Sequence, residues 1–133
     1  MVGQPIQQLV HPELSYRIVG ILFRAHNELP KGYQEKHVQR TVALFFEKEG
    51  LKFKEQAGAV IRIGEKIIGR YFLDFVVDNK IVVELKVGEK LSRKDFDQIK
   101  SYLDSTNLEL GLLARFSSKG VKVYRVLRPT KRN

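Results

Sequence analysis

The sequence predicts an α/β protein in which a mixed β-sheet packs against helices. Two observations lead to this fold class. Apolar residues recur at helical or strand spacing in the order helix, helix, three strands, helix and two strands. This order lacks the repeated strand–helix–strand units of a nucleotide-binding fold, and neither a GxGxxG nor a GxxxxGK[ST] phosphate loop occurs. At 133 residues, one domain covering residues 1–133 is expected.

Two helices are expected at the start of the chain. In residues 11–29, Pro12 suits a first helical turn, and apolar residues such as Ile18 and Leu22 recur at helical spacing. Gly32 lies in the break that follows. A second apolar stripe predicts a helix over residues 33–49, which ends before a glycine.

Three strands follow, separated by turn residues. They are expected over residues 51–63, 66–77 and about 80–87. Gly64–Glu65 and Asp78–Asn79 provide the two turns. Phenylalanines of this region and of the second helix are expected in the core, namely Phe45, Phe46, Phe53, Phe72 and Phe75.

The last third of the chain predicts a helix and two strands. Ser92, with Asp95 three residues later, forms a capping pattern for a helix to about Asp104. Short strands are expected over residues 109–115 and 121–127, with a Ser/Lys/Gly turn between them.

The charge of the chain favours a polyanionic partner. The formal net charge is +9 and the pI is about 9.9, so nucleic acid is the first expectation and an anionic membrane surface the second. From Arg115 to Asn133 there are seven Lys or Arg residues and no acidic residue, and the basic tail comprises residues 128–133. Such a tail can also serve solubility alone.

Composition and patterning exclude several other classes. No apolar run approaches the roughly 20 residues that span a bilayer, and residues 1–10 lack the features of a secretory signal. Cysteine is absent, which excludes disulfides and thiolate metal sites. A cytoplasmic location is therefore the default expectation.

Two acidic residues stand inside apolar strands. Asp74 lies in YFLDFVV and Glu84 in KIVVELK. With a three-residue loop between the strands, Asp74 faces Glu84, and Lys86 lies on the same face. Phe72, Val76 and Val82 would share that face. A two-residue loop would shift the register by one, which leaves the alignment open.

Two facing carboxylates require compensation. At ~5 Å they repel by roughly 3 kcal/mol with an effective dielectric of 20. Protonation, a lysine or a bound cation relieves this repulsion, and carboxylate oxygens without Cys or clustered His suit Mg²⁺ or Mn²⁺. With Lys86 nearby, these are the components of metal-assisted phosphodiester hydrolysis. The alternative is a solvated surface ion pair.

Further polar residues have both a structural and a functional interpretation. Glu35 in the first turn of the second helix favours the helix dipole, or belongs to the site. Gln98 and Tyr102 lie four apart on one helix face, as a solvated and a half-buried residue or as site residues. The three histidines show no metal-ligand spacing, and His37, near Glu35, is the one to follow.

Together, these motifs resemble the PD-(D/E)XK nuclease superfamily. They are Gly32-x-x-Glu35, Asp74, Glu84-x-Lys86 and Gln98-x-x-x-Tyr102, and they look like those of the GxxExxY proteins, a small RecB-like branch. The resemblance spans residues 13–128. It implies a restriction-endonuclease-like fold: a mixed β-sheet flanked by helices, with an αβββαβ core, an extra N-terminal helix and a C-terminal strand.

The resemblance also implies roles for individual residues. Asp74 and Glu84 would be the main metal ligands, with the Leu85 carbonyl and Glu35 as additional ones. Lys86 would be the catalytic lysine, and Gln98 with Tyr102 would shape the site and contact substrate. Two positions depart from the pattern: Val38 replaces the motif's tyrosine, and Leu73 replaces the proline that often precedes the aspartate.

The leading functional hypothesis is a nuclease that hydrolyses phosphodiester bonds in DNA with Mg²⁺ or Mn²⁺. Lys90, Arg93 and Lys94 would contact phosphates without reading sequence. One alternative is a structure-specific endonuclease similar to Holliday-junction resolvases. Another is a non-catalytic nucleic-acid-binding module. The limited DNA footprint of one chain leaves a homodimer open.

Overall fold

Two amphipathic helices form where apolar residues recur at helical spacing. The computed structural model describes residues 10–129. Helix α1 spans Pro12–Glu28 and helix α2 spans Glu35–Lys48, so α2 begins two residues later than the sequence predicts. The start is fixed by Gln34, whose backbone N–H donates to Nδ1 of His37 at 2.9 Å. His37 therefore has a structural task in the first turn of α2.

The strands within residues 10–129 form one five-stranded sheet in the order β1-β2-β3-β4-β5. Their bounds are β1 Phe53–Ile63, β2 Lys66–Val77, β3 Ile81–Val87, β4 Leu110–Ser117 and β5 Gly120–Leu127. Neighbouring strands are antiparallel except β3 and β4, which are parallel. Helix α3 (Arg93–Thr106) makes the crossover between them. The predicted mixed sheet is confirmed.

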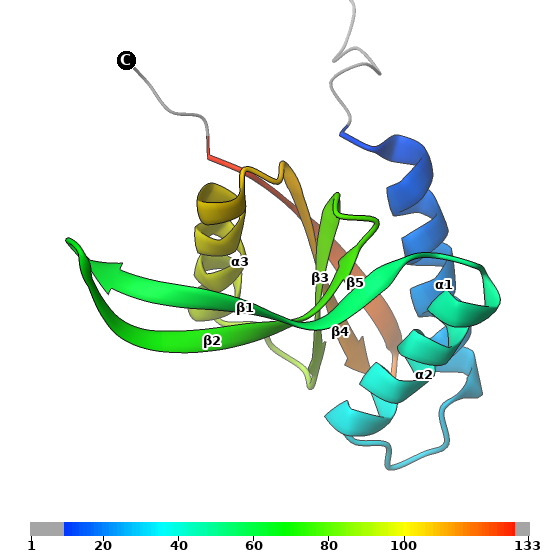
Figure 1. The fold of residues 1–133 in the computed structure, drawn as a ribbon. Coiled ribbons are helices and arrows are strands. Elements are labelled where there is room, and N and C mark those ends of the chain that lie inside the picture. The colour runs from blue at the N-terminus through cyan, green and yellow to red at the C-terminus, as the bar shows by residue number, and fades with distance from the viewer. Residues whose placement is uncertain (1–9, 130–133) are drawn as a thin grey trace, which may run out of the picture.

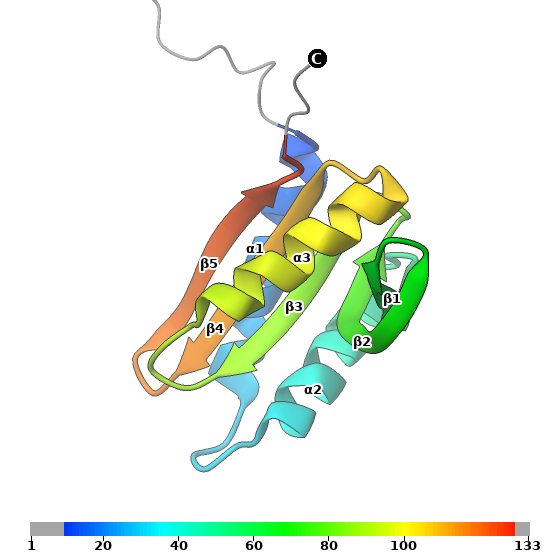
Figure 2. The same cartoon turned by 90° about the vertical axis from the view of Figure 1, so that its left-hand side faces the viewer.

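Helices cover both faces of the sheet (Figures 1 and 2). Helices α1 and α2 bury one face, in a core that includes Phe46 and Phe75. Helix α3 covers the other face through Ile99, Tyr102 and Leu103. No helix within residues 10–129 is long and apolar enough to cross a membrane.

The β1–β2 hairpin leaves the sheet and projects from it (Figure 1). Strand β2 pairs with β3 only from Phe75 to Val77, whereas its ladder with β1 continues outward to Lys66. At the bend, Gln56 of β1 has a φ of 57°, which is uncommon for a non-glycine residue. We call residues 58–72, the part of the hairpin beyond this bend, the arm.

The bend corrects two expectations. Phe72 is 58% exposed and does not belong to the core, whereas its neighbour Leu73 is buried beneath α3. Strict alternation from Phe72 to Val76 is therefore interrupted where β2 leaves the sheet. Residues 130–133 of the predicted basic tail, and residues 1–9, lie outside the described residues.

Candidate active site

Asp74 and Glu84 meet where β2 and β3 diverge. Strands β2 and β3 are joined by the three-residue loop 78–80, and Val77 pairs with Ile81, which is the register that places Asp74 opposite Glu84. Beyond Phe75 and Val83, the last paired residues of β2 and β3, backbone N–H groups donate to these two carboxylates instead of to backbone carbonyls of the neighbouring strand. The Asp74 N–H donates to Glu84 Oε1 at 3.0 Å, and the Leu85 N–H donates to Asp74 Oδ2 at 2.8 Å.

Both carboxyl groups resist ionisation in this position. Burial, followed by the charge of Asp74, raises the pKa of Glu84 to about 8. Burial also raises the pKa of Asp74, although the hydrogen bond from Leu85 opposes the shift. Glu84 is only 6% exposed. The pair therefore has a strong tendency to retain a proton or to accept a cation.

Lys86 is the cation closest to this pair. Its Nζ lies 3.6 Å from Glu84 Oε2 and 3.7 Å from Asp95 Oδ1. Burial lowers the pKa of Lys86, but the charges of Glu84, Glu35, Asp95 and Asp74 outweigh it, and the net shift is upward. Lys86 is therefore a firmly charged group among carboxylates.

Glu35 lies at the first position of α2 and is exposed. It is not hydrogen-bonded into the Asp74–Glu84 pair, but its charge raises the pKa of Lys86, which places it within electrostatic reach of the site. Val38, one turn later, is fully buried in the core between α1, α2 and the sheet. Val38, which stands where the family motif has a tyrosine, therefore packs in the apolar core.

Gln98 and Tyr102 occupy the inner side of α3. The backbone carbonyl of Gln98 accepts a hydrogen bond from the Tyr71 hydroxyl at 2.8 Å, and its side chain is half-buried. Tyr102 is buried in the core beneath α3, and burial, then Tyr71, raises its pKa. These two residues connect α3 to the root of the arm, which belongs to β2, the strand that carries Asp74.

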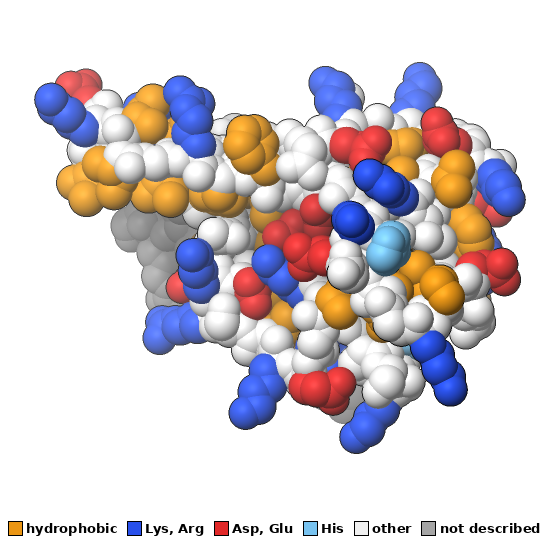
Figure 3. All heavy atoms as spheres, turned by 90° about the horizontal axis from the view of Figure 1, so that it is seen from below, with side chains coloured by type: hydrophobic (Ala, Val, Ile, Leu, Met, Phe, Trp, Pro, Cys, Tyr) orange, Lys and Arg blue, Asp and Glu red, His pale blue; other side chains and the backbone are white. Residues whose placement is uncertain are grey.

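The acids gather at one end of the sheet. This end contains the carboxyl end of β3 and the first turns of α2 and α3, and Figure 3 shows Asp and Glu side chains near the centre of the face, with Lys or Arg beside them. Lys90, Arg93 and Lys94 are exposed in the β3–α3 loop and the first turn of α3. Arg93 also lies 3.8 Å from Asp97. The three residues predicted to contact phosphates therefore lie in the segment that comes directly after β3, the strand that carries Lys86.

The donor set fits a hard, partly hydrated cation. Within residues 10–129, no three Asp, Glu, His or Cys side chains form a ready-made metal cage. The buried pair supplies only carboxylate oxygens, and Mg²⁺ commonly binds through one or two carboxylates while it keeps several waters. Asp74 and Glu84 therefore fit Mg²⁺ or Mn²⁺ better than a metal that prefers nitrogen or sulfur.

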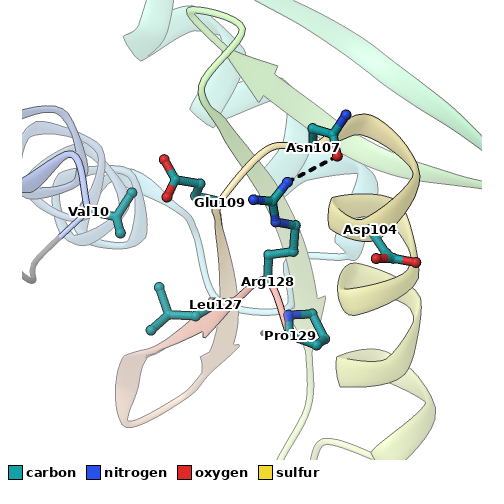
Figure 4. A pocket seen from close by; sticks show the side chains of 7 residues that line it. All are labelled: Val10, Asp104, Asn107, Glu109, Leu127, Arg128 and Pro129. Atoms are coloured by element: carbon teal, nitrogen blue, oxygen red, sulfur yellow. Dashed lines mark hydrogen bonds between the residues drawn. The ribbon is translucent and has the colours of Figure 1, made fainter. Parts of the chain in front are cut away.

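Two cavities lie near the ends of the sheet, and neither is lined by the acid pair. One of about 540 Å³ lies at the same end, between the α1–α2 loop and the carboxyl ends of β3 and β4. Here the Tyr33 hydroxyl is buried without a partner among the described residues. Another, of about 410 Å³, lies at the opposite end, where Arg128 donates to Asn107 at 3.1 Å (Figure 4).

Sequence reasoning missed the role of Asp95 beside Lys86. It assigned Asp95 to the cap of α3, and its Oδ2 does accept from the Ser92 N–H at 2.9 Å. Its other carboxylate oxygen contacts Lys86. The available signal is the short loop between Lys86 and the cap, because so few residues must return the first turn of α3 to the end of β3.

Comparisons with known proteins identify the superfamily and the fold of this chain. Residues 12–126 match the model of the PD-(D/E)XK nuclease superfamily, and no curated protein matches the sequence. Two solved structures share the fold at 13% sequence identity. An alkaline exonuclease, LHK-Exo from Laribacter hongkongensis, has a TM-score of 0.52 over 90% of this chain and 71% of its own. A protein described as SSO0001 has a TM-score of 0.50 over 86% of this chain and 67% of its own. The chain has the restriction-endonuclease-like fold and belongs to the PD-(D/E)XK nuclease superfamily.

Proposed function

We propose that this protein is a divalent-metal-dependent nuclease that hydrolyses phosphodiester bonds in DNA. The observation that carries the proposal is the pair of the half-buried Asp74 and the buried Glu84, with Lys86 Nζ 3.6 Å from Glu84. Membership of a nuclease superfamily, the DNA-compatible net charge of +9 and the exonuclease fold neighbour support it.

Each residue has a separate task in this proposal. Asp74 and Glu84 hold Mg²⁺ or Mn²⁺, with the Leu85 carbonyl as a further ligand. A metal ion held there would supply Lewis-acid chemistry at the phosphate. Lys86 orients the attacking water and offsets negative charge on the phosphate as the phosphorus–oxygen bond to the leaving group breaks. Glu35 supports the water or metal from the start of α2.

The remaining predicted residues position the substrate. Gln98 and Tyr102 fix α3 against the root of the arm and shape the wall of the site. Lys90, Arg93 and Lys94 hold phosphates of the DNA backbone, which supplies affinity without base specificity. A homodimer and a cytoplasmic location stay predictions from the sequence.

Cleavage assays test the function directly. Linear duplex, single-stranded, flapped and four-way-junction DNA are incubated with Mg²⁺ or Mn²⁺, and with EDTA as the metal-free control. We expect metal-dependent cleavage of at least one substrate, and a loss of about 100-fold or more in Asp74→Ala and Lys86→Ala. Circular dichroism checks that both variants fold.

Other results would change the assignment. Retained DNA binding without cleavage of any substrate would favour a non-catalytic binding module. Cleavage restricted to four-way junctions would favour a resolvase-like enzyme. Full activity in the Asp74→Ala variant would contradict the proposed site.

A further inference from the structure

The arm presents large apolar side chains to solvent. The exposed fractions are Ile61 41%, Ile63 67%, Ile67 45%, Ile68 60% and Phe72 58%. A two-stranded ribbon is marginally stable in water on its own, and the β1–β2 register puts Ile61 and Ile67 on opposite faces, so the arm exposes apolar side chains on both of its faces. Exposed apolar surface of this kind on a soluble protein commonly marks a contact surface. The outer part of the arm therefore has the character of a surface that contacts a partner.

The charge of the arm indicates which partner it contacts. Within residues 58–72 the charged side chains are Arg62, Lys66, Arg70 and Glu65, and all four are exposed. Three cations and one anion leave an excess of two positive charges on the arm, on a chain whose net charge is +9. This excess opposes contact with the arm of a second copy and favours a polyanion.

The arm is also continuous with the candidate active site. One strand, β2, carries Arg70 and Lys66 on the arm and Asp74 at its root. The root is fixed by the hydrogen bond from the Tyr71 hydroxyl to the Gln98 carbonyl at 2.8 Å. Figure 3 shows the arm and the acidic cluster on one face of the molecule, with apolar side chains along the arm and Lys or Arg near its end. A nucleic acid bound at the acids can therefore extend along the arm.

We propose that the arm lies in a groove of a DNA duplex beside the cleavage site. A two-stranded β-ribbon fits the major groove of DNA, and known ribbon proteins bind DNA with their strands in the major or the minor groove. Arg62, Lys66 and Arg70 contact backbone phosphates on the two sides of the groove. The isoleucines contact sugars and base edges. The proposal rests on the proposed nuclease function and adds duplex DNA as the form of substrate that the arm holds.

The length of the arm sets the reach of this contact. From Asp74 to Ile67, seven residues of extended chain cover roughly 23 Å at about 3.3 Å per residue. At ~3.4 Å per base pair along one strand, that distance corresponds to about seven base pairs. The duplex is therefore held about seven base pairs to one side of the phosphate that is cleaved.

DNA binding by the 133-residue chain tests the arm without any need for cleavage. Fluorescence anisotropy with a 24-base-pair duplex in EDTA compares the wild type with three variants. They are a charge variant (Arg62→Ala, Lys66→Ala, Arg70→Ala), an apolar variant (Ile63→Ser, Ile68→Ser) and a matched control (Lys48→Ala, Lys52→Ala, Lys80→Ala). The control lysines are exposed at the end of the sheet opposite the acids, at the end of α2 and in the loops before β1 and β3.

We expect the charge variant to lose about tenfold or more in duplex affinity. The slope of the logarithm of the binding constant against the logarithm of the salt concentration should become shallower by about 2.7, because three phosphate contacts at ~0.9 each are lost. The apolar variant should lose severalfold in affinity with an unchanged slope. The control should bind like the wild type.

Because the chain has no cysteine, Glu65→Cys labelled with an environment-sensitive dye places a single probe at the turn of the arm. Its emission should change on addition of the duplex, with the same midpoint as the anisotropy.

Wild-type affinity in the charge variant, or a dye that does not respond to the duplex, would overturn the proposal. So would an apolar variant that binds DNA normally but changes from dimer to monomer in light scattering, because a second copy would then cover the arm. These measurements are made without metal, so they separate the two proposals. DNA binding that depends on the arm, with no cleavage in Mg²⁺, would reject the nuclease function and support the DNA-binding role of the arm. Cleavage in Mg²⁺ by a protein whose DNA binding does not depend on the arm would support the nuclease function and reject the role of the arm.

Discussion

At the scale of single residues, the pair of Asp74 and Glu84 is suited to binding a cation, whereas ionisation of both carboxyl groups lowers the stability of the fold. Glu84 is buried beside Asp74, and a second carboxylate nearby makes ionisation of both unfavourable. The sequence predicts this pair only with a three-residue loop, which is one of the two registers it leaves open, and the structure has that register. The sequence does not predict that the carboxylates accept backbone N–H groups of the opposite strand, since that depends on where the two strands diverge.

The raised pKa of Glu84 predicts how metal-free stability depends on pH. Burial and Asp74 raise the pKa from 4.5 to about 8, so between these values the folded chain binds more protons than the unfolded chain. Stability should therefore fall as pH rises from about 4.5 to 8. Glu84→Gln removes the ionisation and should be more stable than the wild type above pH 8, with a smaller difference near pH 5. Thermal unfolding in EDTA across this range measures the difference.

Added Mg²⁺ or Mn²⁺ provides the second half of this test. A cation between the carboxylates favours their ionised form, so it should raise the melting temperature of the wild type more at pH 8.5 than at pH 6. Glu84→Gln should lose most of this gain. An equal effect of metal on both proteins would mean that the cation binds elsewhere, and a wild type that parallels Glu84→Gln at every pH would contradict the shifted pKa.

At the scale of elements, the sequence pattern predicts where a strand begins and ends better than it predicts which strand lies beside it. The predicted bounds of β2, residues 66–77, agree with the structure, because apolar alternation and the two flanking turns are local features. The arm is not predicted, since nothing local in Lys66–Phe72 indicates that β2 stops pairing with β3 beyond Phe75. For the same reason, Phe72 was expected in the core and is exposed. Side-chain composition alone does not reveal which part of a strand lies outside the sheet.

The contact between α3 and the sheet depends on Gly111 of β4. A Cβ at this position would collide with Ile99 Cγ2 of α3 and lie 3.1 Å from Val82 Cγ1 of β3. Gly111→Ala must therefore displace α3, and we expect a loss of about 1–3 kcal/mol in the free energy of unfolding, as in other overpacked cores. Urea denaturation followed by circular dichroism measures it.

Gly20 provides a matched control with the opposite sign. It lies within α1, where a new Cβ would contact only the flexible end of Arg24, at 3.8 Å. Gly20→Ala should raise stability by roughly 0.5–1 kcal/mol, because alanine favours helix more than glycine does. If both variants were equally stable, α3 would not be packed against β4 as closely as the structure describes.

At the scale of the whole molecule, the sequence predicts how much positive charge there is but not where it acts. The net charge of +9 indicates a polyanionic partner. The fold then brings the arm, which is the outer part of β2, and the β3–α3 loop next to the strands that carry Asp74 and Glu84, although the two segments are separate in sequence. Their common location depends on β2 and β3 being neighbours in the sheet, which composition cannot reveal.

This distribution predicts the effect of removing the loop cations. In the variant Lys90→Ala, Arg93→Ala, Lys94→Ala, three exposed charges next to Lys86 are lost. Backbone contacts carry no sequence information, so affinity should fall by a similar factor for duplexes of different sequence, and the salt slope should decrease by about 2.7. Anisotropy titrations at several salt concentrations in EDTA measure both quantities.

Combining the loop and arm variants tests whether one duplex contacts both groups. Because the two sets lie on different elements and share no hydrogen-bond or ion-pair partner within residues 10–129, their effects on binding free energy should add when a single duplex spans them. The combined variant should then lose about the product of the two fold-changes, while the Lys48, Lys52 and Lys80 control stays at the wild-type affinity. A combined loss much larger than that product would mean that duplex DNA uses the arm and the loop in alternative modes, because each set then supports binding when the other is removed.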